Sequence, residues 1–194
     1  MKIIINESQL RLIVENEAKS HFNFTKYVDA DPSEWDDMYE HINKKKGDKY
    51  DGYYIDGNIN LDGSNVTELN HLVMVDGNFN GGGSFLESLS KLRVVSGNLE
   101  LNNSNINNLD SLVKVGGYLN LSNTPIKDLP NLYWVETTLD VSDTNVIDIP
   151  NLDYVGKMFF TENSPIDKLY NDEEFRKYKI HLWKKMLIAK YVYK

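Results

Sequence analysis

Hydrophobic residues recur at a constant spacing of 20 positions through most of the chain. The clearest column begins at Ile55 and continues with valine at every twentieth residue: Val75, Val95, Val115, Val135 and Val155. Four more apolar columns keep the same register: Ile59/Phe79/Leu99/Leu119/Leu139/Phe159, Val66/Leu86/Ile106/Ile126/Val146/Ile166, Leu69/Leu89/Leu109/Leu129/Ile149/Leu169 and Leu72/Leu92/Leu112/Leu132/Leu152. A fixed period of this length is typical of solenoids, in which each repeat forms one coil and equivalent residues stack.

Within each unit the apolar spacing changes from two residues to three. Leu99 and Leu101 flank a polar residue, and such alternation is typical of a strand with one buried face. The next apolar positions, Ile106, Leu109 and Leu112, predict an irregular or 3₁₀-like return leg that faces the same interior. The sequence therefore predicts a β-solenoid of six 20-residue coils with one parallel sheet.

Two columns of small residues lie at the turns of each predicted coil. A glycine column precedes the strand, where either a positive φ or close contact between coils excludes a Cβ atom. A serine and threonine column follows the strand, where a short hydroxyl bonds neighbouring backbone and turns the chain. The columns are Gly57, Gly77, Gly97 and Gly117, and Ser64, Ser84, Ser104, Thr124, Thr144 and Ser164.

The glycine-rich stretch from Asn80 to Ser84 has the composition of a phosphate-binding loop but not its context. No lysine follows at the required place, and no strand and helix flank it. We interpret it as a widened coil in which Gly81 replaces a core leucine. Phe79 and Phe85 are expected to fill part of the resulting gap.

Helices are predicted on both sides of the repeats, where they would cap the apolar ends of the solenoid. A capping box at Asn6 predicts one helix to about Lys19, and Asp31 with Pro32 predicts a second that ends near Gly47. The predicted organisation is an N-terminal strand and helices that cap or dock (1–50), a solenoid (51–170) and a C-terminal capping helix (171–194).

The motifs of the repeat resemble those of a known family. The run from Leu119 to Ile126 has the form L-x-L-x-x-[ST]-x-I and resembles the leucine-rich repeat core, and the segment LDSLVKVGGYLNLSNTPIKDLPNL resembles receptor L-domain coils. Serine or threonine replaces the usual repeat asparagine, and the cysteines of extracellular L domains are absent. Short, Asn-rich repeats of this kind are similar to leucine-rich repeat proteins of large tailed phages. The resemblance implies a protein-binding module, either a virion component or a phage factor that engages a host protein.

The N-terminal segment MKIIINESQLRLIVENE carries a second resemblance. It is similar to short leader helices of tailed-phage proteins that are cut after Leu/Ile-x-Glu, a pattern matched by Ile13-Val14-Glu15. Matches of three residues are common by chance. We therefore favour an uncleaved helix that caps or docks on the solenoid.

Composition excludes several classes of function. The 194 residues, 41% of them hydrophobic, suffice for one domain with a continuous core. Because cysteine is absent, disulfide scaffolds, cysteine nucleophiles and thiolate zinc sites are excluded. The four histidines lack ligand spacing, and no motif of a phosphate loop, a zinc protease or a serine hydrolase occurs. We expect no metal, no cofactor and no enzyme activity.

Charge and hydropathy limit the class of partner. The net charge is −8, although the segment from Arg176 to Lys194 holds seven basic residues and no acid. The acidic body would repel a phosphate backbone, and no stretch approaches the ~20 apolar residues of a membrane span. The N-terminus becomes polar after Ile5 instead of continuing as a signal peptide. We expect neither nucleic acid nor membrane as partner, and a location in the host cytoplasm or the virion.

The outward positions of the predicted strands form the natural binding surface of a solenoid. This surface is polar at its start and gains large side chains toward its end, where Tyr118, Met158 and Phe160 are the expected anchors for a protein partner. Trp134 and Tyr154, on the predicted short edge between coils, would extend the patch. The candidate partner-binding residues are Tyr118, Met158, Phe160, Asn120, Asp140, Glu100, Trp134 and Tyr154.

Two alternatives remain open at this surface. A carbohydrate-binding adhesin or a degenerate β-helix glycan hydrolase would use the Asn/Asp face, where Glu100 and Asp140 are expected ~9.6 Å apart, near the upper limit for an inverting glycosidase. No lysine, arginine or histidine shares the face to shift a pKa. The asparagines have two equally weighted interpretations, as amide ladders between coils or as ligand contacts. The terminal helix is also expected to compete with a partner for Phe160.

Overall fold

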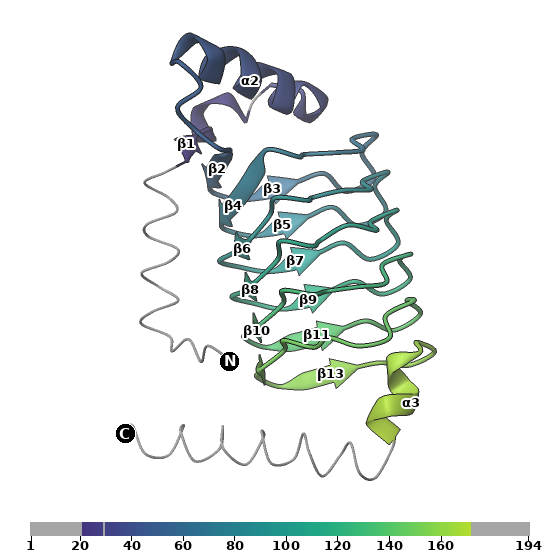
Figure 1. Ribbon diagram of the computed structural model, residues 1–194. Helices are drawn as coiled ribbons and strands as arrows, with labels where there is room; N and C mark the ends of the chain where they lie inside the picture. Colours follow the sequence, from purple (N-terminus) through teal and green to yellow (C-terminus); the bar gives the residue numbers. More distant parts are fainter. Residues whose placement is uncertain (1–20, 29, 172–194) are drawn as a thin grey trace, which may run out of the picture.

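A computed structural model describes residues 21–28 and 30–171 as a parallel β-solenoid of about five turns (Figure 1). Each coil contributes a short strand to each of two sheets, A and B, and all pairings within them are parallel. Sheet A consists of β1 (Phe22–Asn23), β2 (Tyr53–Asp56), β4 (Leu72–Asp76), β6 (Val94–Val95), β8 (Lys114–Val115), β10 (Trp134–Val135) and β12 (Tyr154–Val155). Sheet B consists of β3 (Ile59–Asn60), β5 (Phe79–Asn80), β7 (Leu99–Glu100), β9 (Leu119–Asn120), β11 (Thr138–Asp140) and β13 (Met158–Phe160).

The solenoid prediction is confirmed, but the prediction of one parallel sheet is wrong. The valine column at the start of each repeat lies in strands of sheet A, and the chain then bends at the glycine column into sheet B. At this corner neighbouring coils touch through backbone: a Cβ atom on Gly77 would lie 2.3 Å from the carbonyl oxygen of Gly57. The N–H of Gly97 donates to the carbonyl of Gly77 at 2.8 Å. Close contact between coils therefore explains the glycine at position 77.

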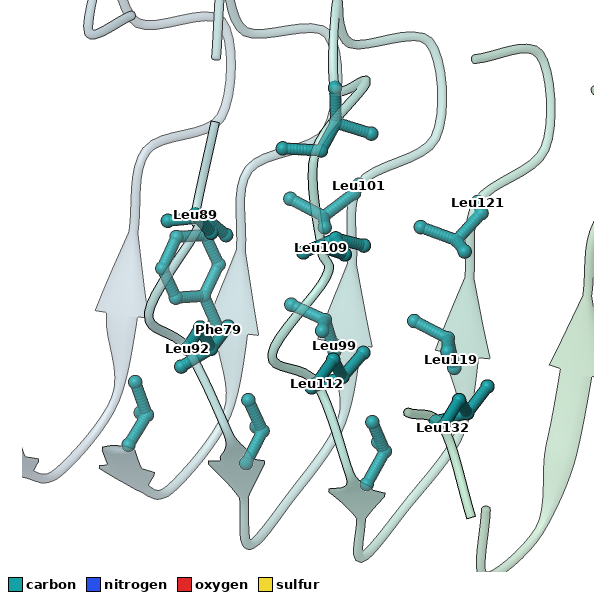
Figure 2. Close-up of a cluster of buried hydrophobic side chains, with 14 of the residues drawn as sticks. Phe79, Leu89, Leu92, Leu99, Leu101, Leu109, Leu112, Leu119, Leu121 and Leu132 are labelled. Atoms are coloured by element: carbon teal, nitrogen blue, oxygen red, sulfur yellow. The ribbon is translucent and has the colours of Figure 1, made fainter. Parts of the chain in front are cut away.

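The core consists of equivalent residues stacked between the two sheets and the return legs. The register pairs Leu99 with Phe79 on one side and Leu119 on the other, and Figure 2 shows these side chains in one continuous column. Leu109 and Leu112 face them from the return leg, where the N–H of Leu112 donates to the carbonyl of Leu109 at 3.0 Å. All five side chains are fully buried. This three-residue turn confirms the irregular return leg.

The sixth repeat contributes strands to both sheets but does not close a sixth turn. Its return leg is replaced by α3 (Ile166–Asn171), which begins five residues before the predicted C-terminal helix. Ile166 keeps its place in the core at 1% exposure. The rest of the predicted C-terminal capping helix lies outside the described residues.

The corner after each sheet B strand is fixed by two columns. In five of the six coils the serine or threonine hydroxyl donates to the carbonyl three residues earlier, as Ser104 does to Leu101 at 2.6 Å and Thr124 to Leu121 at 2.6 Å. The hydroxyl of Ser64, in the first coil, does not make this bond. The residue just before the hydroxyl has a left-handed backbone in every coil, with φ between 55° and 63°. These residues are Gly63, Gly83, Asn103, Asn123, Asp143 and Asn163. Glycine, asparagine and aspartate are the residues that tolerate this conformation best.

A helix packs against the first coil, beyond the end of the stack (Figure 1). A 3₁₀ turn, Thr25–Tyr27, follows β1, and a second, Pro32–Glu34, leads into α2 (Trp35–Lys45). Asp31 accepts the N–H of Ser33, so the predicted N-cap is confirmed, although it caps the 3₁₀ turn. Trp35 and Tyr39 are buried against an aromatic cluster that includes Phe24 and Tyr53. Helical capping of both ends remains a prediction, because residues 1–20 and 172–194 lie outside the described residues.

The space left by the missing leucine at Gly81 is filled from one side only, and the coil keeps the regular strand register there. A Cβ atom on Gly81 would lie 3.0 Å from side-chain atoms of both Phe79 and Leu101. Phe79 is fully buried and occupies the space of the missing leucine, whereas Phe85 is 55% exposed. The expectation that Phe85 also fills the gap is therefore wrong, because its position in the repeat faces outward.

The inward columns should carry most of the stability. Replacing Leu121, which is fully buried, by alanine should lower the free energy of unfolding by about 2–5 kcal/mol through lost burial and a residual cavity. Replacing Ile147, which is 62% exposed, by alanine is the matched control and should cost little. Urea unfolding followed by circular dichroism measures both. Equal losses in the two variants would contradict the inward and outward assignment.

Candidate functional site

The outer face of sheet B carries three rows of outward side chains, and the first is a hydrogen-bonded ladder. Asn58 Oδ1 accepts the N–H of Asn78 at 2.7 Å, and Asn78 Oδ1 accepts the N–H of Asn98 at 2.8 Å. Asn98 Oδ1 accepts the N–H of Tyr118 at 3.0 Å. These contacts favour the structural interpretation of the asparagine column over ligand contact.

The second row is engaged in local turns. Asn60 and Asn80 each accept the N–H of the residue two positions later, at 3.2 and 3.1 Å. Two predicted partner-binding residues do the same: Asn120 accepts from Ser122 at 3.0 Å and Asp140 from Ser142 at 2.9 Å. Each keeps a second oxygen or an amide nitrogen for other contacts, but its orientation is set by the turn.

Tyr118 and Glu100 form a pair on adjacent coils. The Tyr118 ring is half-buried, and its hydroxyl hydrogen-bonds Glu100. Burial, together with this hydrogen bond and the negative charge of Glu100, raises the pKa of Tyr118 to about 12. The hydrogen bond thus ties the side chain of Tyr118 to the preceding coil.

Met158 and Phe160 are the large apolar side chains that extend from this face. Met158 is 52% exposed and Phe160 is 43% exposed, both on β13 at the last coil. In the register of β11 and β13, Met158 lies beside Thr138 and Phe160 lies beside Asp140. The two apolar side chains therefore stand next to a short hydroxyl and a carboxylate.

The outward rows of this face carry only negative charge. Among the described residues they hold four acids and no lysine, arginine or histidine, although the exposed Lys157 directly precedes Met158 at the corner before β13. The acids are Asp62, Glu100, Asp140 and Glu162. A complementary surface would therefore present positive charge around an apolar centre.

Trp134 and Tyr154 lie on the outer face of sheet A, so the predicted short edge was wrong. Both residues belong to strands, because a second sheet lies where the sequence predicted only a short edge between coils. Their rings stack with centroids 3.9 Å apart and planes 13° apart. Trp134 Nε1 donates to Glu136 at 2.8 Å, and Lys114 Nζ lies 5.9 Å from the Trp134 ring centroid. The eight predicted residues thus occupy two faces, with six on sheet B.

A cleft between α2 and the first coil was not anticipated from the sequence. It has a volume of about 570 Å³ and is lined by Tyr39, His71 and Lys91 among other polar residues. His71 Nδ1 lies 3.5 Å from Asp36 and Nε2 lies 3.7 Å from Glu40, one turn apart on α2. No sequence signal identifies it, since its two walls are about 35 residues apart in the chain.

No group of three or more histidine, cysteine, aspartate or glutamate side chains among the described residues has the arrangement of a metal site. No helix among those residues is long and apolar enough to cross a bilayer.

Comparison of the chain with models of known protein families, with curated proteins and with solved structures finds no match. The function is therefore inferred from the faces described above.

The Tyr118–Glu100 contact gives a prediction at alkaline pH. Burial and the Glu100 contact raise the folded pKa of Tyr118 to about 12, above the unfolded value near 10, so their contribution to stability is present below pH 10 and is lost as pH rises to about 12. Tyrosinate absorbance of wild type minus that of Tyr118→Phe should give a difference curve with a midpoint near 12. In denaturant the same difference curve should shift to about 10. A folded-state midpoint near 10 would contradict the contact.

Proposed function

We propose that the protein is a non-enzymatic binding module that engages a protein partner through the last coils of the sheet B face. The observation that carries the proposal is the exposure of Met158 and Phe160, at 52% and 43%, on an otherwise polar face. Exposed apolar anchors ringed by polar groups supply most of the binding energy in protein interfaces. The asparagines of the earlier coils make internal hydrogen bonds and offer fewer free groups.

The chemistry around the anchors specifies the partner further. Asp140 borders Phe160 in the strand register, and Glu162 follows in the next outward position. With no basic residue in the outward rows, a partner would gain from an apolar side chain flanked by lysine or arginine. Attraction of this kind accelerates association and weakens as salt increases.

The glycan alternative has less support. It needs free amides and carboxylates on the face, whereas the asparagines at 58, 78 and 98 accept backbone N–H groups of the next coil. Glu100 and Asp140 are separated by one intervening coil and hydrogen-bond Tyr118 and Ser142. An affiliation with phage leucine-rich repeat proteins rests on the sequence resemblance alone.

The anchors can be tested by alanine substitution and capture of partner proteins from a cell lysate. Phe160→Ala and Met158→Ala should each weaken capture by more than about 1 kcal/mol with little change in melting temperature. Phe85→Ala, which removes a comparably exposed aromatic ring from another surface, is the matched control and should capture normally. Should Phe160→Ala lower the melting temperature and leave capture intact, Phe160 has a structural role and the proposal fails.

The acidic rim gives an independent test on the same partner. Glu162→Gln should slow association and flatten the salt dependence of binding, because a rim charge acts mainly through long-range attraction. Glu87→Gln, which neutralises an exposed acid on the return leg, should leave both unchanged. Surface plasmon resonance at several salt concentrations measures the association rate. Identical salt dependence in the three proteins would remove the acidic rim from the proposed interface.

A further inference from the structure

The first coil leaves an open strand edge on sheet B but not on sheet A. On sheet A, β1 pairs with β2, and the N–H of Phe24 donates to the carbonyl of Tyr54 at 2.9 Å. Thr25 Oγ1 accepts the N–H of Asp56 at 2.7 Å, and the chain then leaves the sheet in a 3₁₀ turn. On sheet B, β3 is the edge strand and pairs with β5 alone among the described strands. The segment before α2 therefore completes one sheet edge and not the other.

Three backbone carbonyls line the open edge. In the second coil the equivalent carbonyls each accept an N–H of the first coil, at distances from 2.6 to 3.0 Å. In the first coil no group within residues 21–28 and 30–171 donates to them. These carbonyls belong to Asn58, Asn60 and Asp62.

The residues of this edge are also more exposed than their equivalents in the next coil. Asn60 and Asp62 are exposed, whereas Asn80 is half-buried and Gly82 is buried. The second coil is covered on this side by the first, but no earlier coil covers the first. Exposed, unpaired carbonyls at a sheet edge are a template for one more strand.

We propose that β3 is a docking edge for an extended segment of another protein, which adds to sheet B as a parallel strand. Every second N–H of the segment would donate to the carbonyls of Asn58, Asn60 and Asp62, as the first coil donates to the second. The backbone bonds would supply the affinity, and the side chains would supply the specificity. This edge lies at the first coil, so the inference is independent of the binding surface proposed at the last coils.

A single strand fits this edge, whereas a second copy of the solenoid does not. A further coil would need the space above the whole end of the core, including the return leg. Figure 1 shows α2 beyond the first coil, and its Asp36 accepts the N–H of Asn70 on the return leg at 2.6 Å. Trp35 of α2 belongs to the core cluster that includes Ile59 and Leu61. Because α2 already covers the core, the inward side chains of the added strand must be small.

The first coil also specifies the outward side chains of the segment. The N–H of Asn78 donates to the side chain of Asn58 at 2.7 Å, but the N–H of Asn58 has no such acceptor among the described residues. An asparagine in the segment would provide one. Four residues later, a lysine or arginine would lie beside the exposed carboxylate of Asp62. The expected ligand is thus an extended segment with asparagine and a basic residue on one side and small residues on the other.

A peptide with this pattern tests the edge on the full-length protein. The sequence Gly-Asn-Ala-Asn-Ala-Lys-Gly, with fluorescein at its N-terminus and an amide at its C-terminus, should gain anisotropy as protein is added. In parallel pairing its third, fifth and seventh N–H groups point to the edge. N-methylation of the fifth residue should therefore abolish binding. N-methylation of the fourth residue, whose N–H points away from the edge, is the matched control and should preserve it.

Two substitutions at one position provide a matched pair on the protein. The N–H groups of Ile59 and Leu61 donate to the second coil, so the N–H of Asn60 between them points to the open edge. Asn60→Pro should abolish peptide binding without lowering the melting temperature, because proline is tolerated where an edge N–H faces solvent. Asn60→Ala loses the same side chain but keeps the N–H, and it should bind. Asp62→Asn should weaken binding about two- to five-fold.

The outcomes that overturn the proposal are distinct. They are a peptide that does not bind the wild type, equal binding by Asn60→Pro and Asn60→Ala, and equal binding of the two methylated peptides. Sedimentation velocity of the protein alone tests the remaining occupant. Self-association that is lost in Asn60→Pro also overturns the proposal, because a second copy would then fill the edge.

Discussion

The constraint on which the structure depends is the parallel register that sets each residue against the residue 20 positions further along the chain. Leu99 pairs with Leu119 and Glu100 with Asn120, so the nearest neighbour of a side chain is its own equivalent. A residue type is therefore favoured only if it packs or hydrogen-bonds well with copies of itself. Leucine and valine satisfy this inside the solenoid, and asparagine satisfies it outside, where each amide accepts an N–H of the next coil.

The period and the inward columns could be predicted from the sequence because burial repeats with the register. Sheet A could not, because most of its strands place only one residue on the inward side, so the apolar residues show no alternation there. The left-handed corner, in contrast, does have a signal in the sequence. Positions 63 and 83 are glycine and positions 103, 123, 143 and 163 are asparagine or aspartate, which are the residues that tolerate a positive φ.

The candidate site was predictable only where exposure follows from alternation alone. Met158 and Phe160 extend from β13 as the pattern indicated, since nothing beyond strand geometry decides their direction. The raised pKa of Tyr118 depends on its burial and on the carboxylate of Glu100, one coil away. A contact between coils is not visible in the sequence of a single repeat. Trp134 was predicted on a short edge because only one sheet was predicted, whereas it lies in a strand of sheet A. The cleft beside His71 joins segments far apart in the chain, where neither period nor motif applies.

The amide ladder also explains why the large side chains gather at one end of the sheet B face. A row of asparagines stabilises the coils only as long as each member offers an oxygen to the next N–H, and the last such bond runs from Tyr118 to Asn98. Beyond it the same row holds threonine and then Met158, which has no amide to continue the ladder. Where no side-chain hydrogen bond joins the coils, stacking does not restrict the residue type at that position. The change from amide to apolar residues therefore divides the face into a part whose amides join the coils and a part whose side chains do not.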